Sequence, residues 1–331
     1  MRVLITGGCK NGKSTFAEKI AERQRPDGGK LYYLATMIPK DNEDTKRIDI
    51  HRAARAEGGY ETLEIPWDIT RVLDSCGENA SFLFDSLTAL LENEMFGRVG
   101  GFVKDAGPKV LSEVLELLGK TENMVIVSDY ICEDTGRYDE WTERFREALA
   151  SIERRAAEIC DVVIESVYGS MVFHKGWEKV LPEFHESCSE RSCADMTLVT
   201  GGVYQGKLKY VLSELKKDAR VFSCDENSAD VDFDCDVIDR FHMLVLALMR
   251  RGDDPFTFIE ENIKRLSSKI IICDDISCGV VPVDAETRLW REAVGRCMVL
   301  LSGYADSVIR VFCGIPAVLK QREQPKGQTA L

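Results

Sequence analysis

A glycine-rich turn near the start of the chain limits the fold more than any other feature of this sequence. Residues 7–14 read GGCKNGKS, which satisfies the pattern G-x-x-x-x-G-K-[ST]. An apolar segment, Arg2–Thr6, precedes the turn, and a segment with helical periodicity, Ser14–Gln24, follows it. A strand, a turn of this kind and a helix together open a P-loop α/β domain. We therefore predict a phosphate-binding loop at residues 7–14.

The residue types of this loop suit a nucleotide. Glycines let backbone N–H groups approach a phosphate closely, Lys13 adds a cation, and the Ser14 hydroxyl can ligate Mg²⁺. The helix that begins at Ser14 also directs its positive end at the same anion. A chance glycine-rich turn is the alternative, and the flanking strand and helix argue against it. The predicted nucleotide-binding residues of the loop are Gly7, Gly8, Cys9, Lys10, Asn11, Gly12, Lys13, Ser14 and Thr15.

Short apolar segments alternate with helical segments along the next 150 or so residues. The predicted strands are 31–35, 81–84, 124–128 and 162–167, and the predicted helices are 45–57, 86–96, 109–118 and 140–158. This alternation predicts a mainly parallel sheet that is covered by helices. Asp85 directly follows the strand 81–84, where a carboxylate suits the Mg²⁺ side of a phosphoryl-transfer site. We predict a catalytic and metal-binding role for Asp85, with a helix N-cap as the alternative.

The second half of the chain repeats motifs of the first. TLVTGG at 197–202 repeats LITGG at 4–8, and Gly206-Lys207 repeats Gly12-Lys13, both at an offset of 194; residues 305–314 resemble residues 160–169 at an offset of 145. These matches predict a tandem duplication with a shorter second copy. The predicted domains are 1–176 and 196–331, joined by a linker at 177–195. Leu208 replaces the metal-binding hydroxyl, which favours a vestigial second loop over a second working site.

Composition excludes some classes of function. The formal net charge of −13 disfavours binding to nucleic acid or an anionic membrane, because such binding needs clustered Lys and Arg. No apolar run approaches the roughly 20 residues of a membrane span. The chain opens directly into a strand, and its 12 Cys form no CxxC pair. These features predict a cytoplasmic enzyme with reduced thiols and no zinc site.

The motifs of the first half together resemble a known family. The loop is followed by Arg47-Ile-Asp-Ile-His51-Arg52 and then by the segment Tyr60-Glu-Thr-Leu-Glu64. This arrangement resembles the bifunctional adenosylcobinamide kinase/adenosylcobinamide-phosphate guanylyltransferase family of cobalamin assembly. In that family the histidine of R-I-x-x-H attacks GTP and holds GMP as a phosphoramidate. The resemblance therefore implies that His51 is the nucleophile, that Arg47, Arg52 and Glu64 contact nucleotide, and that ATP, GTP and an adenosylcobinamide-type corrinoid are substrates.

The second half keeps a different part of the family pattern. The family's C-terminal signature is matched by residues 274–282 and 288–296 here, whereas the first half has lost its counterpart. Because enzymes of this kind have active sites between subunits, the resemblance implies a composite site with Arg288 and Arg291, and a homo-oligomer. Decay of both copies is the alternative. Two other functions stay open: a P-loop kinase or NTPase in which His51 is inert, and a non-catalytic nucleotide-binding module.

Overall fold

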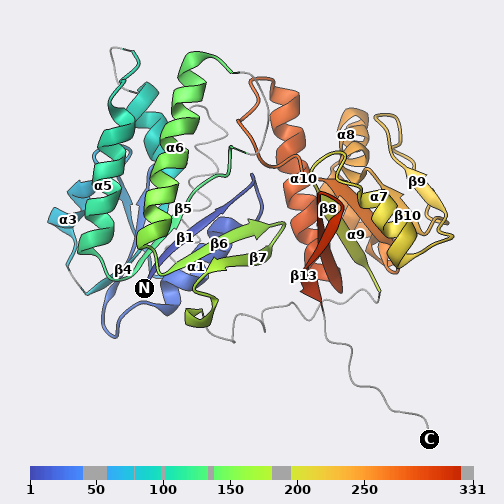
Figure 1. Ribbon diagram of the computed structural model, residues 1–331, viewed down its shortest axis with the longest axis horizontal. Helices are drawn as coiled ribbons and strands as arrows, with labels where there is room; N and C mark the ends of the chain where they lie inside the picture. Colours follow the sequence, from blue (N-terminus) through green and yellow to red (C-terminus); the bar gives the residue numbers. More distant parts are fainter. Residues whose placement is uncertain (40–57, 78, 98–100, 133–137, 181–194, 322–331) are drawn as a thin grey trace, which may run out of the picture. The chain divides into compact units, whose positions relative to one another are not determined.

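The protein was analysed as a computed structural model, which describes residues 1–39, 58–77, 79–97, 101–132, 138–180 and 195–321. The chain divides into two compact units (Figure 1). The first comprises Met1–Gly8, Gly12–Ser166 and Phe173–Leu181, and the second comprises Cys9–Asn11, Val167–Val172 and Pro182–Leu331. Residues 181–194 of the predicted linker lie outside the described residues, so the predicted domain boundaries stay a prediction.

The first unit is built on a seven-stranded sheet with the order β3-β2-β4-β5-β1-β6-β7. Its strands are β1 (Arg2–Gly7), β2 (Lys30–Ala35), β3 (Glu61–Glu64), β4 (Ala80–Asp85), β5 (Met124–Val127), β6 (Val162–Val167) and β7 (Ser170–Lys175). The pairs from β3 through β6 are parallel. The predicted mainly parallel α/β fold and its five strands are therefore confirmed. The strands β3 and β7 were not predicted; the ETLE sequence of β3 lacks the apolar run by which the other strands were recognised.

Helices cover this sheet. They are α1 (Lys13–Arg23), η1 (Ile69–Arg71), α3 (Val72–Ser75), α4 (Leu87–Glu92), the π-helix η2 (Asn93–Gly97), α5 (Ala106–Lys120), α6 (Glu140–Ile159) and η3 (Trp177–Lys179). The helices predicted near 14–24, 86–96, 109–118 and 140–158 are confirmed, and the segment 45–57 lies outside the described residues. α5 and α6 run side by side against the sheet (Figure 1).

Alternation along the strands separates the two faces of the sheet. Leu4 of β1 and Ile126 of β5 belong to a core cluster that includes buried residues of α5 and α6, such as Val110 and Leu149. The neighbouring Ile5 is also fully buried but lies outside that cluster. α1 packs against β1, β4 and β5 and adds none of its residues to the same cluster, so it covers the opposite face. Both faces are therefore buried, as parallel strands require.

The second unit has a six-stranded sheet with the order β13-β12-β8-β11-β10-β9. Its strands are β8 (Thr197–Gly201), β9 (Val221–Ser223), β10 (Val237–Asp239), β11 (Ile270–Asp274), β12 (Ser307–Phe312) and β13 (Ile315–Gln321). Its helices are α7 (Lys207–Tyr210), the π-helix η5 (Val211–Leu215), α8 (Phe241–Arg251), α9 (Pro255–Leu266) and α10 (Ala285–Tyr304). Among the described strands of this sheet, only β13 runs antiparallel to its neighbour.

The two sheets have corresponding strand orders. Read from its other edge, the second sheet runs β9-β10-β11-β8-β12-β13, which matches β2-β4-β5-β1-β6-β7 of the first. The registers agree as well, because Val3 pairs with Val125 and Thr197 pairs with Ile270, at the offsets of 194 and 145. α6 and α10 are both 20 residues long and begin 145 residues apart. This agreement supports the duplication, which stays a prediction.

Candidate active site

The phosphate loop has a backbone that favours glycine at two of its positions. Gly7 has φ +149°, and a Cβ there would lie 2.4 Å from the carbonyl oxygen of Ser166. Gly12 caps α1 in the left-handed conformation, with φ 86°. A larger side chain at either position would strain the loop or push it off β6. The two glycines therefore fix the backbone path of the turn between β1 and α1.

Lys13 is buried at the base of this loop. Its ammonium donates a hydrogen bond to the carbonyl oxygen of Gly8 at 2.6 Å and lies 2.9 Å from Oδ1 of Asp129. The side chain of Lys13 is 7% exposed, whereas that of Asp129 is 44% exposed. The cation is therefore fixed beside the loop by one carbonyl and one carboxylate. A bound phosphate would have to share the Lys13 ammonium with Asp129, or replace Asp129 as its partner.

Hydrogen bonds of the sheet place Asp129 next to the loop. Just beyond β5, the backbone N–H of Ser128 donates to the carbonyl oxygen of Ile5 at 2.9 Å. The backbone N–H of Tyr130 donates to the carbonyl oxygen of Gly7 at 3.0 Å. The N–H of Asp129 points the other way and donates to the Thr88 hydroxyl at 2.8 Å. Asp129 was not predicted. Its counterpart at the offset of 145, Asp274, stands in the segment that matches the family signature, and that match was the signal available.

Asp85 and Glu64 lie at the same edge of the sheet as the loop. Ala35 at the end of β2 is in register with both residues, and Asp85 is in register with Val127. The carboxylate of Asp85 accepts a hydrogen bond from the Tyr33 hydroxyl at 2.7 Å. Ser86, and not Asp85, caps α4. Within the described residues, the ion pair of Lys13 is with Asp129 and not with Asp85.

The oxygen donors near the loop fit a magnesium ion. Ser14 is half-buried and Thr15 is exposed in the first turn of α1. The hydroxyl of Ser14 and the carboxylate of Asp85 are hard oxygen ligands, which Mg²⁺ prefers. The described part of the chain holds no cluster of three or more His, Cys, Asp or Glu side chains arranged for a metal. A Mg²⁺ ion here would therefore depend on the phosphate oxygens of a nucleotide, as is usual in nucleotide sites.

The histidines differ in what the structure shows of them. His51, Arg47 and Arg52 lie outside the described residues, so their predicted roles stay predictions. His174 is exposed on β7, with its Nε2 2.9 Å from Oε2 of Glu165. His242 is buried in α8, and burial lowers its pKa to about 4. His174 and His242 therefore belong to local packing and pairing in their own units.

The second loop repeats the geometry of the first without its hydroxyl. Gly201 and Gly206 have φ values of 140° and 85°, close to those of Gly7 and Gly12. Lys207 donates to the carbonyl of Gly202 at 2.6 Å and lies 2.6 Å from Oδ1 of Asp274. The second loop therefore differs from the first at Leu208, whose side chain has no oxygen atom that could bind a metal ion. Whether this loop is vestigial stays a prediction.

Arg288 and Arg291 donate to backbone carbonyls before α10. The guanidinium of Arg291 is 2.7 Å from the carbonyl oxygen of Val280, 2.8 Å from that of Ser277 and 3.1 Å from that of Gly279. Arg288 donates to the carbonyl of Pro282 at 3.0 Å and to that of Val283. Both arginines thus stabilise the turn at residues 277–283. Their predicted contribution to a composite site stays a prediction.

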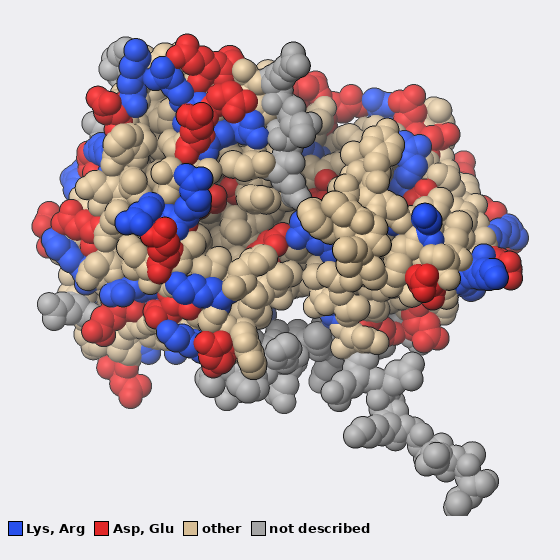
Figure 2. All heavy atoms as spheres, viewed as in Figure 1, with Lys and Arg blue, Asp and Glu red and all other residues tan. Residues whose placement is uncertain are grey.

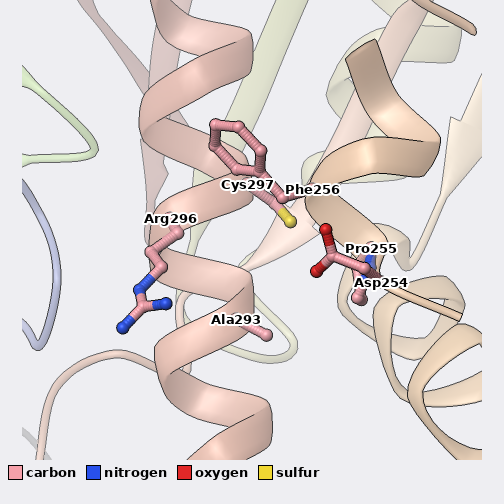
Figure 3. Close-up of a pocket in the computed structure, with 6 residues that line it drawn as sticks. All are labelled: Asp254, Pro255, Phe256, Ala293, Arg296 and Cys297. Atoms are coloured by element: carbon pink, nitrogen blue, oxygen red, sulfur yellow. The ribbon is translucent and has the colours of Figure 1, made fainter. Parts of the chain in front are cut away.

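Among the described residues, the charged surface and one further pocket were compared with the loop. On the face drawn in Figure 2, acidic and basic side chains are interspersed and form no continuous basic field. In the second unit, a pocket of about 380 Å³ lies between the start of α9 and the middle of α10 (Figure 3). Its Asp254 caps α9, and burial raises the pKa of its Cys297 thiol to about 12. None of the described helices is both long and apolar enough to cross a membrane.

Comparisons with solved structures give low overall similarity. A KaiC-like protein, PH0186, from Pyrococcus horikoshii is 18% identical with a TM-score of 0.30; the match covers 49% of this chain and 70% of that protein. The flagellar accessory protein FlaH from Methanocaldococcus jannaschii is 14% identical with a TM-score of 0.29; that match covers 52% and 77% of the two chains.

Comparisons of sequence are more informative. The family described as cobinamide kinase / cobinamide phosphate guanyltransferase matches residues 3–173. The bifunctional adenosylcobalamin biosynthesis protein CobP of Pseudomonas aeruginosa is 30% identical over 184 residues, which cover 53% of this chain and 98% of that protein. The protein CobU of Escherichia coli, named likewise, is 30% identical over 97 residues, which cover 29% of this chain and 51% of that protein. Since the family match spans more than half of the 331 residues, this chain belongs to the cobinamide kinase / cobinamide phosphate guanyltransferase family.

Proposed function

We propose that the first unit phosphorylates an adenosylcobinamide-type corrinoid and then transfers GMP from GTP to that phosphate through His51. The observation that carries the proposal is that the loop of the first half combines a fixed lysine, Lys13, with the hydroxyl of Ser14 at the start of α1. Membership of the family adds the class of substrate. The second unit has the same lysine geometry but lacks the hydroxyl of Ser14.

In the phosphoryl transfer, the hydroxyl oxygen of the corrinoid bonds to the γ-phosphorus, and the bond from that phosphorus to the β–γ bridging oxygen breaks. Lys13 and the loop amides orient the triphosphate and stabilise the charge that develops on its oxygens. Asp129 is exposed enough to accept the hydroxyl proton once Lys13 turns to the phosphate. Mg²⁺, when bound by Ser14 and Asp85, would neutralise further charge on the phosphates.

In the guanylyl transfer, an imidazole nitrogen of His51 attacks the α-phosphorus of GTP and pyrophosphate leaves. A phosphate oxygen of the corrinoid phosphate then attacks the same phosphorus, the P–N bond breaks, and the imidazole is regenerated. The end of β2 leads into the segment that holds His51. This end of β2 lies at the same edge of the sheet as the loop.

Labelling with GTP tests the proposal. Full-length protein is incubated with α-labelled GTP and Mg²⁺, and the adduct is tested for acid lability and alkaline stability, which a phosphoramidate combines. We expect the adduct in the wild type and in His174→Ala, and its loss in His51→Ala with nucleotide still bound. An undiminished adduct in His51→Ala would refute the role of His51. Phosphoryl transfer without any adduct would indicate a simple kinase, and binding alone would indicate a non-catalytic module.

A further inference from the structure

Three buried polar residues surround the carboxyl end of β4, where Asp85 lies. They are Tyr33 of β2, Thr36 just after that strand, and Asn93 of the π-helix η2. They are 6%, 0% and 8% exposed. Burying a hydroxyl or an amide costs free energy unless it is hydrogen-bonded, so the partners of these groups show what the groups are for.

The side chain of Thr36 holds the backbone at the end of β4. Its hydroxyl accepts a hydrogen bond from the backbone N–H of Ser86 and donates one to the carbonyl oxygen of Ser86, both at 2.8 Å. The backbone N–H of Thr36 donates to the carbonyl oxygen of Asp85 at 3.3 Å. Thr36 therefore fixes, through three hydrogen bonds, the two residues at which β4 ends and α4 is capped.

Asn93 in turn holds Thr36. The side-chain amide of Asn93 donates to the carbonyl oxygen of Thr36 at 2.7 Å and to that of Pro66, just beyond β3, at 3.1 Å. The hydroxyl of Tyr33 donates to Oδ2 of Asp85 at 2.7 Å. Both the backbone and the carboxylate of Asp85 are thus restrained, and all of these residues belong to the first unit.

The second unit keeps the same backbone without the three polar side chains. β10 ends at Asp239 as β4 ends at Asp85, and the helix that follows begins two residues later in both units. On this correspondence, at an offset of 154, the strand registers and the sequence place Val221 at the position of Tyr33, Cys224 at that of Thr36 and Ala247 at that of Asn93. The backbone N–H of Cys224 still donates to the carbonyl oxygen of Asp239, at 3.0 Å. The polar groups therefore are not needed for this arrangement of strands, and they occur in the unit whose loop has the hydroxyl of Ser14.

We propose that Tyr33, Thr36 and Asn93 are positioning residues that hold the carboxylate of Asp85 for a Mg²⁺ ion on the nucleotide. The inference rests on the proposed function, in which Ser14 and Asp85 bind that ion. Hydrogen bonds that orient a ligating carboxylate strengthen metal binding, and loss of such partners lowers metal affinity roughly 10- to 100-fold. The three residues act through Asp85 and need not touch the ion.

The test is the Mg²⁺ requirement of nucleotide binding by the full-length protein. A fluorescent GTP analogue is titrated first in EDTA and then over a series of Mg²⁺ concentrations. In Thr36→Val, Asn93→Ala and Tyr33→Phe, we expect half-saturation at roughly tenfold more Mg²⁺ than in the wild type. The affinity in EDTA should stay within about twofold of the wild type, because Lys13 still binds the phosphates.

Matched variants separate positioning from stability. Thr36→Ser keeps the hydroxyl and should keep the wild-type Mg²⁺ requirement. Thr121→Val removes another buried hydroxyl of the first unit, which donates to the carbonyl oxygen of Leu117 at 2.7 Å, and it should also leave the requirement unchanged. Tyr33→Phe removes a single oxygen atom, so it tests the inference even if Asn93→Ala fails to fold.

Asp85→Asn identifies the source of the effect. This change should itself raise the Mg²⁺ requirement, and Thr36→Val should add little to it, because both changes act on one metal ligand. A wild-type requirement in Thr36→Val, Asn93→Ala and Tyr33→Phe, or an equal loss of affinity in EDTA, would overturn the inference alone. If Asp85→Asn leaves the requirement unchanged, the metal-binding role of Asp85 in the proposed function is rejected, and the inference falls with it.

Discussion

The Nζ atom of Lys13 lies 2.9 Å from Oδ1 of Asp129, and this pair is reproduced in the second unit by Lys207 and Asp274 at 2.6 Å. Each lysine also donates to a loop carbonyl at 2.6 Å. The lysine of an intact phosphate loop and that of a loop without the metal-binding hydroxyl are thus held alike. The pair by itself stabilises the loop, and other residues must decide whether nucleotide chemistry follows.

Lys13→Ala should weaken binding of a triphosphate by at least tenfold. The change removes a charge-assisted hydrogen bond to phosphate, which contributes about 1.5–3 kcal/mol. Titration with a fluorescent GTP analogue measures the loss. Lys207→Ala is the matched control, because it removes the equivalent ion pair from the second unit, and it should leave the affinity within about twofold. Equal losses in the two variants would assign nucleotide binding to both loops.

Gly7→Ala should destabilise the first unit by more than about 2 kcal/mol and weaken nucleotide binding. The added Cβ would lie 2.4 Å from the carbonyl oxygen of Ser166 and would also face an unfavourable φ of +149°. Gly28→Ala separates the two causes, because Gly28 also has a positive φ but nothing within 4 Å of its Cβ position. It should cost only about 1 kcal/mol. Urea denaturation measures the free energy of unfolding of both variants. Equal losses of stability in the two variants would contradict the steric argument.

Lys109→Met should destabilise the protein by about 1.5–3 kcal/mol. Lys109 forms ion pairs with Glu94, which is 1% exposed, and with Asp68 at 2.7 Å. Its removal leaves the carboxylate of Glu94 buried without this cation. Lys120→Met is the control, because Lys120 pairs with Glu116 in the same helix but both side chains are exposed. The control should cost less than about 1 kcal/mol. Denaturant midpoints of the two variants test the difference.

Glu153→Met should stabilise the protein above pH 7 and have less effect near pH 5. Burial raises the pKa of Glu153 in the folded state from 4.5 to about 7, so between these values the native state binds more protons than the unfolded state. The free energy of unfolding therefore falls as pH rises through this window, by up to about 3 kcal/mol. The variant removes this fall. A pH series of denaturant melts should show its gain over the wild type growing from pH 5 to pH 8; a constant difference would contradict the assignment.

Much of the fold follows from local sequence. The loop at residues 7–14 and the strands at 31–35, 81–84, 124–128 and 162–167 are marked by short apolar runs and turn residues, which act over a few positions. The mainly parallel sheet follows from their alternation with helices. The predicted position of Asp85 at a strand end is also local, and the structure places it at the edge of the sheet that carries the loop.

The partners of the loop depend on tertiary structure. β5 lies between β1 and β4 although it is the later of the three in the chain, and this order brings Asp129 to Lys13 across more than a hundred residues. The burial of the Oε1 atom of Glu153 depends in the same way on how α6 packs against the sheet. Sequence alone determined that a phosphate loop and a parallel α/β fold exist here, because these depend on neighbouring residues. Only the tertiary structure decided which carboxylates meet the lysine, because strand order and helix packing are set by burial summed over the whole unit.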